Sequence, residues 1–192
     1  TNPKATLHMA NGADIVIELL PEAATKHSKQ LYYAASSYLD HHAIERIVPG
    51  NWVDVSYTAF GHKELQYLIP NEFALNPDVT PLDPIQAVSA WADMGKRDWQ
   101  AVNSSSLRDC PDHKGTYPVF GKVISGMNEI RRIAAVKTVP VDFPIPGVEV
   151  NKPVEPQVIE TVELELTVKL IGTGPGRKPE AAKVLAKIIK LQ

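Results

Sequence analysis

The sequence has a single cysteine, Cys110, among 192 residues. One thiol excludes a disulfide bond within the chain and is typical of proteins in a reducing compartment. No apolar run reaches the roughly 18 residues that a membrane-spanning helix needs. Residues 1–20 also lack the charged and apolar regions of a signal peptide. We therefore expect a cytoplasmic protein without a membrane span.

Charge of one sign is not in excess either. The chain has 20 Lys and Arg against 22 Asp and Glu, a formal net charge of −2, and the two signs are interspersed. Such a composition offers no basic field for the phosphates of a nucleic acid. Binding to nucleic acid is therefore not expected.

Motifs for metal, nucleotide and covalent chemistry are also missing. Cys110 and His113 have a metal-like spacing, but no second cysteine and no tight histidine cluster accompany them, so we expect no zinc. The glycines within 172–176 follow no nucleotide-binding spacing, and Pro175 interrupts them. The serines at 104–106 lack the context of a nucleophile elbow and are predicted to be loop. The sequence thus predicts neither a metal nor a cofactor.

A hairpin is the clearest pattern that is present. The segments ATLHMA (5–10) and ADIVIEL (13–19) flank Asn11-Gly12, which predicts two strands and a two-residue turn with positive φ. After a proline, PEAATKHSKQLYYAASS (21–37) has apolar residues at helical spacing. The chain is therefore expected to begin with a β-hairpin followed by a helix.

The rest of the chain is mostly short strands separated by breakers. Further strands are predicted for AIERIV (43–48), WVDVSY (52–57), QAVSAWA (86–92), WQAVNS (99–104), YPVFGKVIS (117–125) and QVIETVELELTVKLI (157–171). Helices are predicted for 127–136 and, after a linker, for 179–192. The last helix has lysines on one face and Leu and Ile on the other, which predicts packing on the parent domain or a partner, with a membrane surface as the alternative. These elements favour a mainly β fold: a closed antiparallel β-barrel capped by two helices, plus an extra C-terminal helix.

Four of these segments resemble the cyclophilins, a family of peptidyl-prolyl cis-trans isomerases, and most of all its bacterial members. The hairpin with ADIVIELLPEAATKHSKQ (13–30) is similar to the family's first two strands and first helix. AIERIVPGNWVDV (43–55) is similar to the family's FHRIIPGFMIQGG segment. PVFGKVISGMNEIRRIAAVKT (118–138) is similar to its FGKVxxGMxxVxxI strand and helix, and NKPVEPQVIETVELE (151–165) to the final strand of bacterial members. The resemblance implies a cyclophilin-like domain over 1–170, followed by the linker and amphipathic helix over 171–192.

The resemblance also implies a site around the 43–55 segment. Arg46 aligns with the family's catalytic arginine, and Asp54 takes the position of a glutamine that steadies this arginine. Gln100 aligns with a family glutamine, and Val102 with a pocket phenylalanine. The apolar cup for the substrate would then be lined by Ile44, Trp52, Val102 and Tyr117.

Alternation along the strands bears on the same residues. A period of two places Ile44 and Val48 on the strand face of Arg46, and Trp52 on the face of Asp54 in the next strand. Because an aspartate forms a charge-assisted pair with an arginine, Asp54 is expected to hold Arg46 firmly.

The chemistry implied by the resemblance needs no proton transfer and no metal. It is the rotation of Xaa-Pro bonds in proline-containing polypeptides, with reduced activity because the pocket departs from the family pattern. The alternative is a non-catalytic module on the same fold that binds proline peptides. For Arg46 itself, the alternative to catalysis is a structural role in which it pairs with Asp54 or Glu45.

Overall fold

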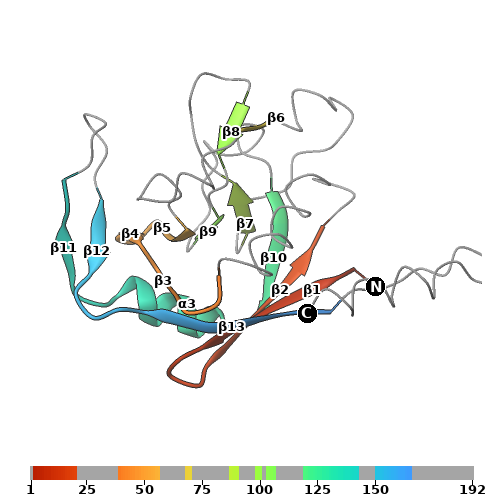
Figure 1. The fold of residues 1–192 in the computed structure, drawn as a ribbon, viewed down its shortest axis with the longest axis horizontal. Helices are drawn as coiled ribbons and strands as arrows, with labels where there is room; N and C mark the ends of the chain where they lie inside the picture. Colours follow the sequence, from red (N-terminus) through yellow and green to blue (C-terminus); the bar gives the residue numbers. More distant parts are fainter. Residues whose placement is uncertain are drawn as a thin grey trace, which may run out of the picture.

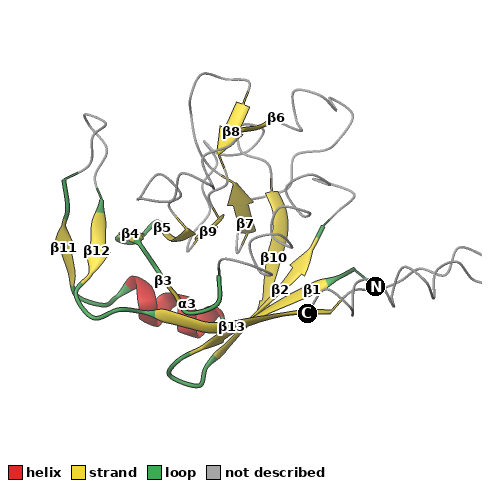
Figure 2. Ribbon diagram, in the orientation of Figure 1, coloured by secondary structure: helices red, strands yellow, loops and turns green. Residues whose placement is uncertain are grey.

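The computed structural model describes residues 2–20, 39–56, 68–70, 87–90, 98–100, 103–106, 119–142 and 150–165. Within them lie thirteen strands and one helix, drawn in Figures 1 and 2. The strands are β1 (Lys4–Met9), β2 (Asp14–Leu19), β3 (His42–Ala43), β4 (Arg46–Val48), β5 (Trp52–Ser56), β6 (Leu68–Pro70), β7 (Ala87–Ala90), β8 (Asp98–Gln100), β9 (Asn103–Ser106), β10 (Val119–Ser125), β11 (Thr138–Pro140), β12 (Asn151–Pro153) and β13 (Val158–Glu165). The helix is α3 (Met127–Ala134).

Eleven of the strands form one sheet in the order β11-β12-β4-β5-β9-β7-β10-β2-β1-β13-β3, and β6 pairs with β8 separately. All the pairings are antiparallel. Strand β3 ends the order on one side, yet only Ile44 and Glu45 separate it from β4 near the other side. The sheet therefore curls back on itself (Figure 1). The predicted mainly β, antiparallel fold is confirmed. Among the described strands, no pairing between the two ends of the order closes a barrel.

The predicted helix over 127–136 is confirmed by α3. The helices predicted for 21–37 and 179–192 and the linker before the second lie outside the described residues. In the described part of the chain, no helix is both long and apolar enough to cross a bilayer.

The N-terminal hairpin forms where the sequence predicts it, but its turn is longer than two residues. Strand β1 ends at Met9 and β2 begins at Asp14. The Gly12 N–H donates to the Met9 carbonyl oxygen at 2.8 Å, and only Gly12 in this loop has a positive φ, +86°. The Asn11 side chain accepts a hydrogen bond from the Ala13 N–H at 3.1 Å, which stabilises the wider loop without a left-handed Asn11.

Two expectations for the middle of the chain are wrong. The single strand predicted over 99–104 is divided between β8 and β9. The serines at 104–106, predicted to be loop, belong to β9, which pairs with β5 on one side and β7 on the other. Because two neighbouring strands supply partners for its backbone, β9 forms despite its polar sequence and lack of alternation.

The hydrophobic core lies on one face of the curled sheet. Its fully packed cluster comprises Ala5, Leu7, Met9, Ile15, Ile17, Leu19, Leu39, Ile44, Ile47, Val53, Phe120, Val123, Ile130, Ile133 and Ile159. The alternation of β1 and β2 sends every second residue into this cluster. Helix α3 packs against β2 and β5 and contributes Ile130 and Ile133.

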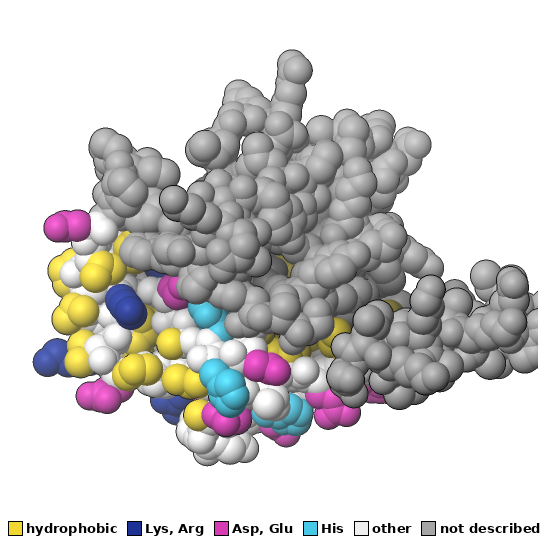
Figure 3. All heavy atoms as spheres, viewed as in Figure 1, with side chains coloured by type: hydrophobic (Ala, Val, Ile, Leu, Met, Phe, Trp, Pro, Cys, Tyr) yellow, Lys and Arg dark blue, Asp and Glu magenta, His cyan; other side chains and the backbone are white. Residues whose placement is uncertain are grey.

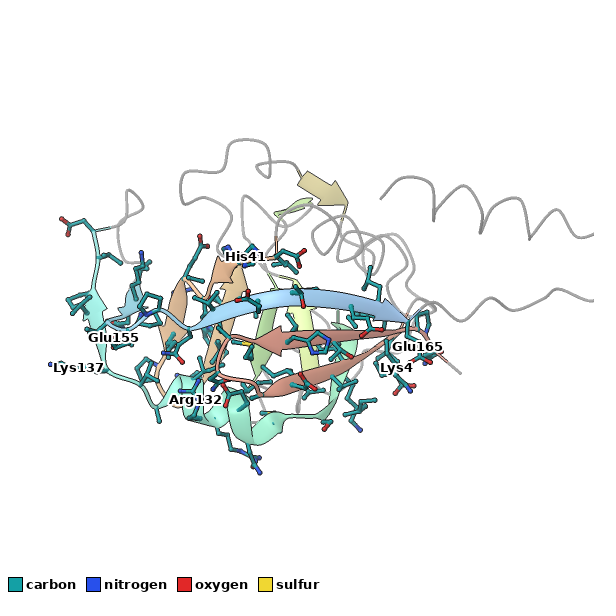
Figure 4. All side chains as sticks on the ribbon, turned by 60° about the horizontal axis from the view of Figure 1, so that its bottom comes forward. Lys4, His41, Arg132, Lys137, Glu155 and Glu165 are labelled. Atoms are coloured by element: carbon teal, nitrogen blue, oxygen red, sulfur yellow. The ribbon has the colours of Figure 1, made fainter. Side chains whose placement is uncertain are left out.

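The opposite face of β1, β2 and β13 is polar. Lys4 Nζ lies 3.7 Å from Glu165 Oε2 at one end of the β1–β13 pair, and both are labelled in Figure 4. His8 lies 2.7 Å from Asp14 and 3.5 Å from Glu163. Figure 3 shows histidine and acidic side chains gathered in the lower part of the molecule. The hydrogen bond that His8 donates to Asp14 raises the pKa of His8. Among the described residues, this face of the sheet is covered by charged side chains and not by a layer of helices.

Candidate active site

A tight turn places the site residues of β4 and β5 opposite one another. Pro49 and Gly50 occupy its central positions, Gly50 has φ +74°, and the Asn51 N–H donates to the Val48 carbonyl oxygen at 3.0 Å. This is the pattern of a type II turn, which favours proline followed by glycine. The turn sets the register Arg46 opposite Asp54, Ile47 opposite Val53 and Val48 opposite Trp52.

This register separates a core face from a polar face. Ile47 and Val53 lie in the hydrophobic cluster. Since side chains alternate along a strand, Arg46 and Asp54 lie on the other face. There the Arg46 Nη1 donates to Asp54 Oδ2 at 3.1 Å. The predicted contact between these two residues is therefore present.

The Arg46–Asp54 pair is largely removed from water. The Asp54 side chain is 0% exposed and the Arg46 side chain 10%. Burial raises the pKa of the Asp54 carboxyl from 3.8 to about 7, although the charge of Arg46 and its hydrogen bond act in the opposite direction. Asp54 Oδ1 is buried and accepts no hydrogen bond from the described residues. The carboxyl is thus near the point where its neutral and ionised forms are equally stable at neutral pH.

The strand register that contains Arg46 and Asp54 continues across the sheet beyond β5. Asp54 is opposite Ser104 of β9, and Ser104 is opposite Ser89 of β7. This register places the backbone positions of Ser104 and Ser89 in line with Arg46 and Asp54 across the sheet. The sequence analysis missed both serines because their register depends on strand pairing between segments far apart in the chain.

A bulge lies beside Asp54. The register of β5 against β9 shifts between Asp54 and Ser56, which leaves Val55 as the extra residue. His42 Nε2 donates to the Val55 carbonyl oxygen at 2.8 Å. A bulge re-aims the side chains next to it and is common beside active sites.

The other predicted site residues are placed as follows. Trp52 is half-buried and opposite Val48, two residues from Asp54 on the same strand. Ile44 is 3% exposed and lies in the core cluster just before β4. Gln100 ends β8, where it is opposite Leu68 in the separate two-stranded sheet. Val102 and Tyr117 lie outside the described residues.

Ile44 thus lies with the core residues Ile47 and Val53, apart from Arg46. The alternation expected from 43–48 is interrupted because residues 44 and 45 belong to neither β3 nor β4. The Ile44 N–H instead donates to the Gln157 carbonyl oxygen at 2.9 Å.

No group of three or more His, Cys, Asp and Glu residues in the described part of the chain is arranged to hold a metal ion. The charged groups at the site are the guanidinium of Arg46 and the buried carboxyl of Asp54. Such a pair can hydrogen-bond a polar substrate and stabilise charge that develops on it.

Comparison with known families identifies the chain. Residues 5–163 match the family model described as cyclophilin type peptidyl-prolyl cis-trans isomerase/CLD. The chain belongs to this family. Its members are peptidyl-prolyl cis-trans isomerases, and the chain is accordingly an isomerase of the cyclophilin type. No curated protein matches the sequence.

Solved cyclophilin structures have the same fold. A cyclophilin type peptidyl-prolyl cis-trans isomerase of Cryptosporidium parvum is 15% identical and matches with a TM-score of 0.64, covering 88% of this chain and 100% of that one. A second crystal structure of that protein, determined in the presence of the dipeptide Ala-Pro, is 16% identical with a TM-score of 0.65, covering 85% of this chain and 99% of the other. At these identities the likeness shows that the folds agree.

Proposed function

We propose that this cyclophilin-type chain isomerises Xaa-Pro bonds in polypeptide substrates with Arg46 as its catalytic cation. The observation that carries this role is the position of Arg46 on the polar face of β4, buried and held by Asp54 at 3.1 Å. The family membership supplies the reaction, and this geometry supplies the residue.

The chemistry requires a group that stabilises a twisted amide. Rotation about the peptide bond has a barrier of about 18–20 kcal/mol because amide resonance is lost on the way. As the proline nitrogen becomes pyramidal it gains a lone pair, to which a guanidinium donates a hydrogen bond. This bond exists mainly in the transition state, so it raises the rate rather than only the affinity. Arginine suits this role because it stays protonated and offers several donors in a rigid fork.

The rest of the proposed pocket follows the family alignment. Trp52 is the described residue best placed beside Arg46 and Asp54 for contact with a proline ring, since it shares their face of the β4–β5 pair. Contact of Gln100, Val102 and Tyr117 with the substrate remains a prediction. Ile44 lies in the core cluster just before β4, so its proposed role is to support the pocket from the core. A crystal structure of the C. parvum protein was determined in the presence of the dipeptide Ala-Pro, which favours a proline-containing ligand for the present chain as well.

The proposal also covers the architecture of the whole chain and its location in the cell. We infer a closed β-barrel over 1–170 capped by two helices, a linker and amphipathic helix over 171–192 that packs on the barrel or on a partner, and a cytoplasmic location. Support comes from the sequence patterns and from the family match over 5–163.

A second function is favoured by the same ion pair. If Asp54 keeps the Arg46 Nη1 engaged at 3.1 Å, fewer donors reach a substrate, and the chain binds proline peptides without rapid turnover. This is the non-catalytic module of the sequence analysis.

The deciding experiment is exchange-detected NMR of capped Xaa-Pro peptides with wild type, Arg46→Ala and Arg46→Lys. We expect catalysed exchange in wild type and a loss of kcat/KM on the order of 10²-fold in Arg46→Ala, as for removal of one transition-state donor. Arg46→Lys keeps the charge without the fork and should recover only part of the rate. The matched control is Arg131→Ala, which removes an exposed arginine of α3.

The outcomes separate the two functions. Peptide shifts that report binding without exchange would favour the module. Exchange that is equally fast in Arg46→Ala, with that variant folded by circular dichroism, would contradict the catalytic role of Arg46.

A further inference from the structure

We propose that Asp54 is a positioning residue whose protonation controls the isomerase: the neutral carboxyl leaves the charge of Arg46 available to the substrate, and the ionised carboxyl neutralises it. This inference rests on the proposed function, because it presumes that Arg46 acts on the twisted amide. It adds a pH dependence to a reaction that itself transfers no proton.

The geometry couples the two side chains tightly. They are opposite in the register of β4 and β5, and Arg46 Nη1 lies 3.1 Å from Asp54 Oδ2. Asp54 is fully buried, so solvent does not screen its charge from the guanidinium. Any change in the charge of Asp54 is therefore felt directly at Arg46.

The surroundings of Asp54 favour a proton on it. Its Oδ1 is buried and accepts no hydrogen bond from the described residues. A carboxylate oxygen in that state has lost its hydration without replacement, which penalises the ionised form. The pKa of Asp54 accordingly rises to about 7, within the range of ordinary cellular pH.

Few other described charges face Asp54. Strand β9, on the far side of β5, has only Asn103 and serines. Helix α3 also packs against β5, but with the core cluster that contains Val53, on the opposite face. The ionisable residues of the packed elements, besides Arg46, are His42 and Glu45 beside β4, and Glu129, Arg131 and Arg132 on α3.

His42, Glu129, Arg131 and Arg132 have bonding partners other than Asp54. His42 donates to the Val55 carbonyl oxygen, so it contacts the backbone of β5 rather than the carboxyl. Arg132 donates to Glu129 at 2.8 Å, and Arg131 donates to Asn128 at 3.3 Å. Arg46 is thus the described cation that pairs with Asp54. A change in the protonation of Asp54 therefore changes the electrostatic field of Arg46.

The direction of the effect follows from the field of the pair. Beside a neutral acid, the charge of the guanidinium is not offset by Asp54 and acts on the proline nitrogen. Beside a carboxylate, the two charges form a dipole whose attraction is weaker, and one donor points at Asp54 rather than at the substrate. The rate is therefore expected to fall as the pH rises through the titration of Asp54.

The test is kcat/KM from exchange-detected NMR between pH 5 and pH 9, with a capped peptide that has no ionisable group. For wild type we expect a decrease of roughly three- to tenfold centred near neutral pH, smaller than the loss of a whole donor because Arg46 stays in place. Asp54→Asn should give a flat profile at the level of the wild-type acid limb. Glu155→Gln, which removes an exposed carboxylate, is the matched control and should keep the wild-type profile.

A second measurement keeps the proposal testable if Asp54→Asn folds poorly. The side-chain carboxyl carbon of Asp54 is followed by ¹³C NMR in wild type, with the same midpoint expected as in the rate profile. A flat wild-type profile, or an Asp54 midpoint below about 5, the range of an ordinary aspartate, would overturn the gating.

The proposed function and the gating fail in different ways. If Arg46→Ala abolishes exchange but the wild-type profile is flat, Arg46 is catalytic and the gating is overturned. If Arg46→Ala leaves exchange unchanged, the catalytic role of Arg46 is overturned first, and the gating with it. Absence of exchange at every pH would overturn both.

Discussion

Burying a carboxylate beside a guanidinium removes hydration that a single hydrogen bond does not fully replace. Asp54 is in this situation: it is 0% exposed, bonded to Arg46 through Oδ2, and its Oδ1 accepts no hydrogen bond from the described residues. At the residue scale, the burial of Asp54 disfavours the charged form of its carboxyl, while Arg46 favours it. Such conflicts are concentrated at functional sites, where shifted pKa values are part of the chemistry.

The conflict predicts a specific dependence of stability on pH. Because the pKa of Asp54 is raised from 3.8 to about 7, the folded state holds a proton that the unfolded chain has released at intermediate pH. The contribution to stability is complete below the unfolded pKa and is lost as the pH rises through the folded one. We expect the free energy of unfolding to fall by on the order of 2–4 kcal/mol over this range from Asp54 alone.

Urea unfolding of wild type and Asp54→Asn between pH 4 and pH 8 measures this contribution. The difference between the two proteins is the quantity of interest, because other groups act in the opposite sense. The hydrogen bond from Arg132 lowers the pKa of Glu129, so that carboxylate contributes stability that is lost on acidification. A difference between wild type and variant that does not change with pH would contradict the prediction.

At the scale of elements, the junction between β10 and α3 depends on one glycine. Gly126 is the N-cap of α3 and has φ +85°. A Cβ on this residue would lie 2.7 Å from the Ile15 Cα and in conflict with the Asp14 carbonyl oxygen of β2. The helix is also tied to the β1–β2 turn, because Asn11 donates to Glu129 Oε1 at 2.9 Å. Close approach of β2 is therefore what allows α3 to cover the core.

This junction gives a matched pair of substitutions. Gly126→Ala should lower the free energy of unfolding by about 2–4 kcal/mol, since left-handed strain adds to a clash with the backbone of β2. Gly12→Ala is the control: Gly12 has nearly the same φ, +86°, but nothing lies within 4 Å of its added Cβ. It should lose only about 1 kcal/mol. If chemical denaturation gave the same loss in free energy of unfolding for both variants, the close approach of β2 to Gly126 would be contradicted.

At the scale of the whole molecule, the described sheet is assembled entirely from residues before 166. Strand β13 pairs with β1 and β3, and the family match ends at residue 163. The core cluster extends from Ala5 to Ile159. The described sheet and its core therefore do not require the predicted tail over 171–192.

Removal of that tail tests the division of the chain. A chain ending at residue 170 should keep its isomerase rate and melt within about 3 °C of the full chain, equivalent to about 1 kcal/mol at this size. A chain ending at residue 157 is the control; it loses β13 and Ile159 and should not fold. A large drop in melting temperature for the first deletion, measured by calorimetry, would mean that the tail contributes to the fold of the domain.

Local sequence was sufficient for several elements. The alternation in ATLHMA and ADIVIEL predicted the first hairpin, Pro49-Gly50 predicted the turn between β4 and β5, and the apolar spacing after residue 127 predicted α3. Each depends on contacts between residues close in the chain, where turn chemistry and periodicity act directly. That Arg46 and Asp54 are neighbours was implied by the resemblance of residues 43–55 to the family segment.

Tertiary structure decided the rest. Strand β9 forms from a polar sequence because β5 and β7 supply its partners, and that pairing alone aligns Ser104 with Asp54. Ile44 turns to the core because the chain leaves the strand between β3 and β4. By itself, the sequence determined the β4–Pro49-Gly50–β5 hairpin that brings Arg46 close to Asp54. How deeply Asp54 is buried, and hence its affinity for a proton, depends on distant strands that exclude water, which no local pattern encodes.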